Sequence, residues 1–451
     1  MDEAQGLLLR ARAILDLAEP RSEVAEVVIA QSRDLSVRVR KGEVERVEEA
    51  GAHGAGLRVF VDGRAGSASS NDLTDAGLER LVDDALDVAK MTEPDPFDGP
   101  PEPELLATDI PDLELEDPEL ARFDATAATE AALACEQAAL ESDARLTNSD
   151  GAECARTHGA MAFATTGGFA GAYPSSFVRI SARPLADDGG GKKRGASHWD
   201  AQRFLEALAD PSEVGRRAAE KTLARLGAEK VPTAEMPVIF DPDAGRALLG
   251  ALAGCTSGGA VHRRSTYLAD REGSPVASSL VTIVDDPLIL RGPGSRPFDG
   301  EGLPSRRNVV VNEGLLETFL CDCYAGRKLS RPSTGSASRG LGGRPGVSTS
   351  NFRMLPGDAS QAELIADTQR GLLVTSMMGF GFNAVTGDFS RGAEGFLIED
   401  GRIGRPVSEV TISLNFDELW RSIDAVGHDV DERSSTAVPS FRVAKMTVAG
   451  R

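Results

Sequence analysis

The sequence has little of several residue types that particular functions need. Its 451 residues include 49 Lys and Arg against 70 Asp and Glu, giving a formal net charge of −21. Nucleic-acid binders need clustered basic surface for phosphate contacts, and anionic membranes repel acidic proteins, so this charge argues against both kinds of partner. Five irregularly placed cysteines are too few for a disulfide framework.

Segments that direct a chain to or into a membrane are also missing. Asp2 and Glu3 stand where a signal peptide needs positive charge. The longest nearly apolar run, residues 159–173, is shorter than the roughly 18 residues of a membrane span. We therefore expect a cytoplasmic protein.

Motifs that carry chemistry are equally scarce. None of the five histidines precedes a glutamate, so there is no H-E-x-x-H zinc helix. Cys321-Asp322-Cys323 would place two thiols on one strand face, but two thiols make half of a tetrahedral zinc site, and we interpret the triplet as a partly buried strand. Cys255 lies among small apolar residues, the usual setting of an inert core thiol. The G-x-G-x-x-A pattern at residues 379–384 lacks the following helix that a dinucleotide site requires.

Turn, helix and strand signals in the sequence divide the chain into parts. The pairs Lys41-Gly42 and Asp62-Gly63 predict strand hairpins, residues 118–142 predict a long helix, and Asp210 followed by Pro211 predicts the start of another. Beyond about Val231 short strands dominate.

We therefore expect an α+β protein with two N-terminal α/β subdomains and a C-terminal β-rich domain, mostly antiparallel and barrel- or sandwich-like. The expected bounds are residues 1–91 for the first subdomain, 92–117 for a Pro-rich acidic linker, 118–230 for the second subdomain and 231–451 for the β-rich domain.

A late segment, residues 376–401, is dense in glycine and contains Asn383, Asp388 and Arg391. Glycines at this density let backbones approach each other or a bound chain closely. From spacing alone we favour a hairpin network with an internal Asp388–Arg391 ion pair; the alternative is that these side chains meet a peptide.

Four stretches, in this order, carry a resemblance to a known family. They are RVEEAGAHGAGLRVFVDGRAGSASS, DDPLILRGPGSRPFDGEGLPSRRNVVVNEGLLETFLCDCYAGRKLS, MMGFGFNAVTGDFSRGAEGFLIEDGRIGRPVSEVTIS and GHDVDERSSTAVPSFRVAKMTVAG. The chain resembles the TldD/PmbA family over nearly its whole length, and it is more similar to the TldE/PmbA branch than to the TldD branch.

The resemblance implies where a zinc motif is missing. TldD-type subunits carry an H-E-x-x-x-H helix and a cysteine ligand near the carboxyl end. In this sequence Gly250 and Cys255 stand at the histidine positions and Ala251 at the glutamate position, and residues 434–451 contain no cysteine. Glycine and alanine offer zinc no donor atom, and without the glutamate no group activates the water. The resemblance thus implies no metal or other cofactor on this chain, with zinc in a TldD-type partner.

Three functions follow as hypotheses. In the first, the chain is the zinc-free subunit of a heteromeric metallopeptidase, walling a chamber for unfolded peptides that are held at strand edges; Asn383, Asp388 and Arg391 are its candidates for peptide or partner contact. In the second, it is a homodimeric peptide-binding scaffold without proteolytic activity. In the third, it is an independent enzyme using Cys255 or another unrecognised nucleophile. Members of the family have been associated with peptide processing and labelled modulators of DNA gyrase, a label that the charge does not support as DNA contact.

Overall fold

Two glycine-containing turns set the long strands of the N-terminal part. Lys41 and Gly42 have φ values of 56° and 77°, and Asp62 and Gly63 have 51° and 71°; two-residue hairpins need such positive values. The structure, a computed structural model that describes residues 3–450, confirms both predicted hairpins.

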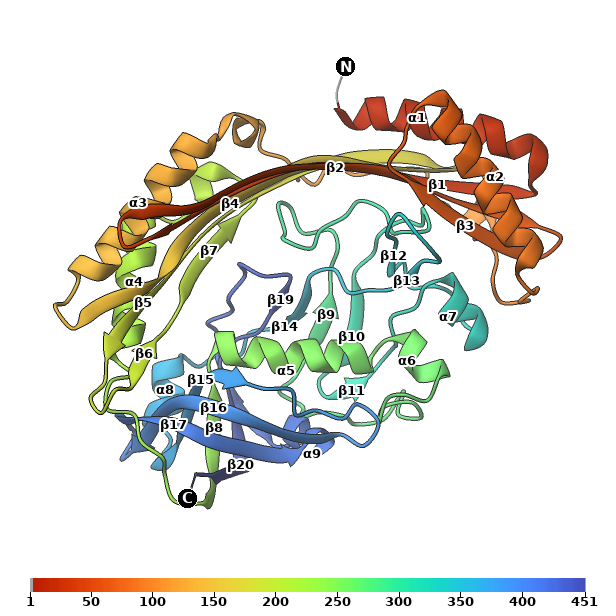
Figure 1. Ribbon diagram of the computed structural model, residues 1–451. Coiled ribbons are helices and arrows are strands. Elements are labelled where there is room, and N and C mark those ends of the chain that lie inside the picture. Colours follow the sequence, from red (N-terminus) through yellow and green to blue (C-terminus); the bar gives the residue numbers. More distant parts are fainter. Residues whose placement is uncertain (1–2, 451) are drawn as a thin grey trace.

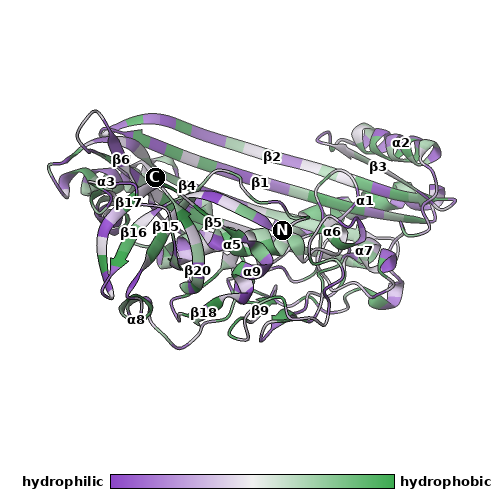
Figure 2. Cartoon of the chain, turned by 90° about the horizontal axis from the view of Figure 1, so that it is seen from below, coloured by the Kyte–Doolittle hydropathy of each residue, from purple (hydrophilic) through white to green (hydrophobic). Residues whose placement is uncertain are grey.

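These strands belong to one antiparallel sheet that arches over the rest of the molecule (Figure 1). Its order is β3-β2-β1-β4-β5-β6, with β7 also paired to β5. Figure 2 shows hydrophilic and hydrophobic bands along β1 and β2. The strands are β1 (Val24–Arg40), β2 (Glu43–Val61), β3 (Arg64–Ser70), β4 (Leu146–Thr165), β5 (Ala170–Asp187), β6 (Lys193–Gly195) and β7 (His198–Gln202).

Two pairs of helices cover the outer face of the arch at its opposite ends (Figure 1). One pair is α1 (Glu3–Ala18) and α2 (Asp75–Met91); the other is α3 (Ala125–Glu141) and α4 (Pro211–Leu223). Each pair buries its apolar face on the same sheet, so two separate cores share the long strand β1. Both N-terminal parts are therefore built on one continuous sheet.

The single helix predicted over residues 118–142 is broken near its start. A 3-10 turn, Pro118–Arg122, precedes α3, and Asp124 begins α3 by accepting a hydrogen bond from the Ala127 amide at 2.9 Å. Since an N-cap residue is non-helical, this cap ends the turn and starts a new helix. The other 3-10 turns are Glu19–Arg21, Pro103–Leu105 and Leu205–Ala207.

The Pro-rich acidic segment, residues 92–117, is held against both parts of the molecule. Arg203 donates to the carbonyl oxygens of Leu115 at 3.1 Å and Gly292 at 2.9 Å. Arg327 donates to the carbonyl oxygens of Phe97 and Gly99. Charge-assisted bonds from the buried Arg203 and the half-buried Arg327 fix the segment as a strap between the arch and the C-terminal part.

The C-terminal part is built on a closed barrel. The strand order β17-β16-β15-β8-β20 closes because β17 also pairs with β20, and β18 extends the sheet from β20. The pairing is antiparallel except between β15 and β8. This confirms the predicted α+β class with a mostly antiparallel β-rich C-terminal domain. The barrel strands are β8 (Ala234–Phe240), β15 (Arg370–Met378), β16 (Asp388–Glu399), β17 (Arg402–Asn415), β18 (Ile423–Val426) and β20 (Phe441–Ala449).

The C-terminal part also has a second sheet, in the order β11-β10-β9-β14-β19, and the pair β12-β13, which lies under the arch (Figure 1). These strands are β9 (Ile283–Asp285), β10 (Asn308–Asn312), β11 (Leu315–Leu316), β12 (Ala337–Ser338), β13 (Gly346–Val347), β14 (Phe352–Met354) and β19 (Thr436–Ala437). The helices are α5 (Pro242–Cys255), α6 (Gly258–His262), α7 (Cys323–Lys328), α8 (Gln361–Ala366) and α9 (Phe416–Arg421). Within residues 3–450, no helix combines the length and apolar character needed to cross a membrane.

Candidate functional site

Helix α5 lies between the barrel and the hollow of the arch (Figure 1). Asp241 begins it by accepting a hydrogen bond from the Ala244 amide at 2.7 Å, and Pro242 follows at the first helical position. One face of the helix is buried in the barrel core: Ala244, Gly245, Leu248, Leu249, Leu252 and Cys255. The helix is therefore fixed by packing on one side, which leaves its other side free to form a site.

The exposed side of the carboxyl-terminal half of α5 offers no metal ligand, and the Asp243 carboxylate near the start of the helix is paired with Lys221. Ala247, Gly250 and Gly254 are exposed and Ala251 is half-buried. A side chain at Gly250 or Gly254 would meet no atom within 4 Å, so the positions have room that no donor occupies. Because zinc needs nitrogen, sulfur or oxygen donors, these residues do not fit a zinc ion.

Cys255 lies on the opposite side of α5 from Gly250. The two are five positions apart, which is about 140° around the helix axis, and Cys255 is buried in the barrel core. Burial raises the pKa of its thiol to about 11. The thiol therefore stays protonated at neutral pH, and since the thiolate is the reactive form, the hypothesis of a Cys255 nucleophile loses its chemical basis.

Nothing nearby completes a metal site. β19 contacts α5, so the chain near the carboxyl end does pass this helix, but its residues Thr436 and Ala437 supply no thiolate or imidazole. Among residues 3–450, no group of three or more His, Cys, Asp or Glu side chains is placed to hold a metal ion.

The Cys321 to Cys323 triplet is not the strand that its alternation suggested. Asp322 is the N-cap of α7 and accepts a hydrogen bond from the Ala325 amide at 2.7 Å. Cys323 is the first residue of that helix, and both thiols are buried. Aspartate at an N-cap turns the chain into a helix at this point, which a period-two pattern of cysteines does not reveal.

The late glycine-rich segment forms the hairpin between β15 and β16, residues 378–388. Asn383 builds its turn: its side-chain oxygen accepts from the Val385 amide at 3.0 Å, and its own amide donates to the carbonyl oxygen of Asp388 at 2.9 Å. The Asp388 carboxylate accepts from the Thr386 hydroxyl at 2.7 Å. Asn383 and Asp388 border one surface hollow of about 590 Å³.

The expected Asp388–Arg391 ion pair does not form among the described residues, which is a correction to the sequence interpretation. Both residues lie on β16, three positions apart, and successive side chains on a strand point to opposite faces. The Nε of Arg391 is instead buried without a hydrogen-bond partner. Contact of these three residues with a peptide or partner stays a prediction.

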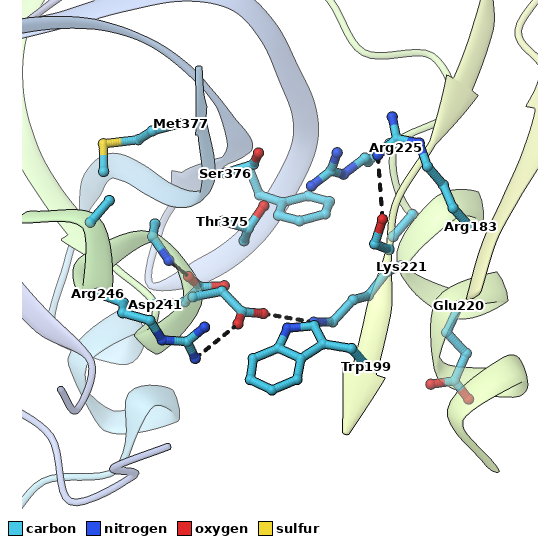
Figure 3. A pocket seen from close by; sticks show the side chains of 16 residues that line it. Arg183, Trp199, Glu220, Lys221, Arg225, Asp241, Arg246, Thr375, Ser376 and Met377 are labelled. Carbon is cyan, nitrogen blue, oxygen red and sulfur yellow. Dashed lines mark hydrogen bonds and ion pairs between the residues drawn. The ribbon is translucent and has the colours of Figure 1, made fainter. Parts of the chain in front are cut away.

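A cavity of about 570 Å³ lies between α4, β5 and β7 on the arch side and α5, β15 and β16 on the barrel side (Figure 3). Its cationic side chains are matched by carboxylates. Lys221 pairs with Asp243 at 2.9 Å and Arg225 with Glu394 at 3.0 Å. The other two pairs are Arg183–Asp150 at 2.9 Å and Arg246–Asp431 at 2.6 Å.

Asp241 also lines this cavity, and unlike the carboxylates of these pairs it has no cationic partner among residues 3–450. Its hydrogen bond to the Ala244 amide is the one that the structure shows for its side chain. Burial raises the pKa of this carboxyl to about 7, against the opposing effect of that hydrogen bond. Removing a carboxylate from water favours its neutral form unless a donor or cation faces it.

One wall of the cavity is aromatic and one is an open strand edge. The guanidinium groups of Arg246 and Arg433 lie over the ring of Trp199, with their Cζ atoms 5.1 and 4.7 Å from the ring centroid. The pairing of β15 with β8 runs from Leu372 to Val374 and stops at Phe240, where β8 ends. From Thr375 to Met378, β15 continues along β16 with no described strand on its other side.

Sequence reasoning missed Asp241, Trp199 and Thr375. The Asp241-Pro242 pair repeats the Asp210-Pro211 signal that predicted α4, so a second capped helix could have been found. The cavity itself brings together residues more than 170 positions apart, and no local pattern reports that.

The chain is similar to known proteins along nearly its whole length. Three family models match: PmbA/TldA metallopeptidase domain 1 over residues 25–89, the central domain over 118–226 and the C-terminal domain over 233–450. The chain is 38% identical over 451 residues to the metalloprotease PmbA of Escherichia coli O157:H7, covering 100% of this chain and 98% of that protein.

Solved structures show the same fold. A putative modulator of DNA gyrase from Bacteroides thetaiotaomicron superposes with a TM-score of 0.92 and 28% identity, covering 100% of both chains. TldE from Thermococcus kodakarensis superposes with a TM-score of 0.88 and 23% identity, covering 98% of this chain and 100% of that one.

Proposed function

This chain belongs to the PmbA/TldA metallopeptidase family, and from that premise we propose that it is the zinc-free subunit of a two-subunit peptidase that acts on unfolded peptides. A TldD-type partner supplies the catalytic zinc, and this chain supplies part of the enclosing wall. The proposal extends to a cytoplasmic location.

The exposed face of α5 is the observation that carries this proposal. The helix keeps its cap and its buried face, yet Gly250, Ala251 and Gly254 leave the carboxyl-terminal half of its open face without donors. Cys255, at the second histidine position of the family motif, is buried on the other side. A helix can support a fold without carrying catalytic or metal-binding side chains, because fold and functional site are independent.

The β15–β16 hairpin supports assembly with a second chain. Phe380 is fully exposed at its tip, and Met378 and Val385 are each about half exposed. A cluster of exposed apolar side chains at one place is typical of a protein interface. Asn383 and Asp388 hold the same hairpin in shape, so the candidates for partner contact lie beside this tip.

Co-purification with a TldD-type subunit that carries the H-E-x-x-x-H motif tests the proposal. Zinc and cleavage of an unfolded peptide are measured for each chain alone and for the mixture. We expect stoichiometric zinc in the partner and the complex, none in this chain, and cleavage by the complex that a chelator abolishes. Cleavage by this chain alone, or a complex no more active than the separate chains, would contradict the proposal.

The second hypothesis, a homodimeric peptide-binding scaffold, rests on the same exposed hairpin and is separated by the same experiment. A scaffold would form a stable homodimer, bind peptide, and give no cleavage with any partner. Sedimentation of this chain with and without the TldD-type subunit distinguishes the two assemblies.

A further inference from the structure

We propose that the cavity between the arch and the barrel binds an extended peptide segment, whose backbone pairs with the open edge of β15 at Thr375–Met378 and whose positively charged group faces Asp241. The inference rests on the proposed function in taking peptides as the ligands. It assigns a binding site to this chain itself, separate from the catalytic site of the partner.

The strand edge provides the first part of the argument. β8 covers β15 only as far as Val374, because the chain leaves β8 at Phe240 and turns into α5; the Asp241 amide donates to the Val374 carbonyl oxygen at 3.1 Å. Beyond this point Thr375, Ser376 and Met377 line the cavity with no strand beside them among the described residues, although α5 contacts β15. An open edge of this kind accepts an added strand through main-chain hydrogen bonds.

The cavity has the size and lining that such a strand needs. Its volume of about 570 Å³ falls in the range of roughly 300–1,000 Å³ typical of ligand pockets. Trp199, Met377 and Phe396 provide apolar contact area on its walls. Figure 3 shows Thr375, Ser376 and Asp241 on the barrel side of the space and Lys221 and Trp199 across from them.

Charge decides which ligand group fits. Lys221, Arg225, Arg183 and Arg246 already have carboxylate partners at 2.6–3.0 Å. Asp241 forms no ion pair among residues 3–450; Lys221 and Arg225 lie near enough to lower its pKa in part, but both are already paired with Asp243 and Glu394. An ammonium or guanidinium group bound at Asp241 would therefore supply the partner that this carboxyl lacks. The shared chemistry is a peptide cation, which either a Lys or Arg side chain or a free amino terminus supplies.

Four labelled octapeptides of Ala, Ser and Gly test the charge requirement by fluorescence anisotropy with the purified full chain. One is acetylated and carries a central Lys, one is acetylated with norleucine there, one has norleucine and a free amino terminus, and one is acetylated with a central Glu. We expect the Lys peptide, the free-terminus peptide, or both to bind roughly ten- to hundredfold more tightly than the acetylated norleucine peptide. Equal binding of all four, or tightest binding of the Glu peptide, would overturn the proposal.

Asp241→Asn removes the charge and keeps a good helix cap. The matched control is Asp210→Asn, which makes the same change at the exposed cap of α4, also followed by proline. We expect Asp241→Asn to abolish the preference for the cationic peptide and Asp210→Asn to keep it. Loss of the preference in both variants would show attraction to the net negative charge of the chain and overturn the site.

N-methylated peptides test strand addition without changing the protein. Amides on one edge of a bound strand alternate with those on the other, so methylation of one alternate set should abolish binding and methylation of the other should leave it nearly unchanged. Equal tolerance of both sets contradicts pairing with β15. Peptide binding is measured without the partner, so its failure is distinguishable from failure of zinc-dependent cleavage in the complex.

Discussion

The two halves of α5 have opposite characters. Its amino-terminal half begins at Asp241, carries Asp243 and Arg246, and borders a cavity of about 570 Å³. Its carboxyl-terminal half exposes Gly250, Ala251 and Gly254, which carry no polar side-chain atom. One helix thus combines an end with charged side chains beside a cavity and an end whose exposed residues carry no polar side chain.

Within α5, the buried face supports the fold, and the exposed face is where a functional site could form. Both halves bury leucines in the barrel core, Leu248 and Leu249 in the middle and Leu252 near the end. Packing fixes the helix whatever its open face carries, because helical stability in proteins comes mainly from the buried face. The open face is then free to differ between subunits of one family.

The largest expected effect tests whether the buried face holds the helix. Leu249→Ala removes a fully buried side chain and should lower the free energy of unfolding by about 2–5 kcal/mol. Denaturant titration followed by circular dichroism measures the change. Leu9→Ala, at a side chain that is 52% exposed, is the control, and equal effects of the two substitutions would show that packing does not fix α5.

A second prediction concerns the apolar tip of the β15–β16 hairpin. Phe380→Asp should weaken association with a second chain by about 2 kcal/mol or more, roughly thirtyfold in Kd, if this ring is buried in the interface. Ile403→Asp is the matched control, since Ile403 is 54% exposed on the next strand of the same sheet. An unchanged sedimentation profile for Phe380→Asp would place the interface elsewhere.

A third prediction follows from the pKa of Asp241, which burial raises to about 7 from 3.8. Between about pH 4 and 7 the folded chain holds a proton that the unfolded chain has released, so this carboxyl destabilises the fold as pH rises. Asp241→Asn does not titrate, so its stability relative to wild type should increase across that window by up to about 4 kcal/mol and then level off.

Urea titrations of wild type and Asp241→Asn at several pH values measure this difference. Asp210→Asn controls for the loss of one negative charge. A difference that is constant from pH 4 to 7 would show that the Asp241 carboxyl is ionised throughout and would contradict the raised pKa.

The smallest effect concerns the other half. Gly250→Ala adds a methyl group that meets no atom within 4 Å and should stabilise the chain by about 0.5–1 kcal/mol, since alanine favours a helix over glycine. Activity of the complex should not change. A loss of stability or activity would show that a neighbouring group uses this open position.

Local features of the fold could be predicted from the sequence, and contacts between distant segments could not. The turns at Lys41-Gly42 and Asp62-Gly63 and the start of α4 at Asp210-Pro211 follow from residue chemistry within four positions. The break at Asp124 was missed although its capping side chain is a local signal.

The site shows the same division. Absence of donors at Gly250 and Ala251 can be seen in the sequence, and the burial of Cys255 agrees with its small apolar neighbours. The open edge at Thr375 depends on β8 ending beside it, more than 130 residues earlier in the chain. Whether Asp241 finds an ion-pair partner depends on which Lys and Arg side chains the fold brings near it. The spacing of residues along the sequence does not show this.

Zinc titration into the isolated chain, followed by calorimetry, tests the central claim most directly. The variant with Gly250→His and Gly254→His places two imidazoles one turn apart on the open face and shows that binding would be detected. We predict no specific zinc binding by the natural chain and measurable binding by the double variant. One zinc held per natural chain, released by a chelator, would contradict the account.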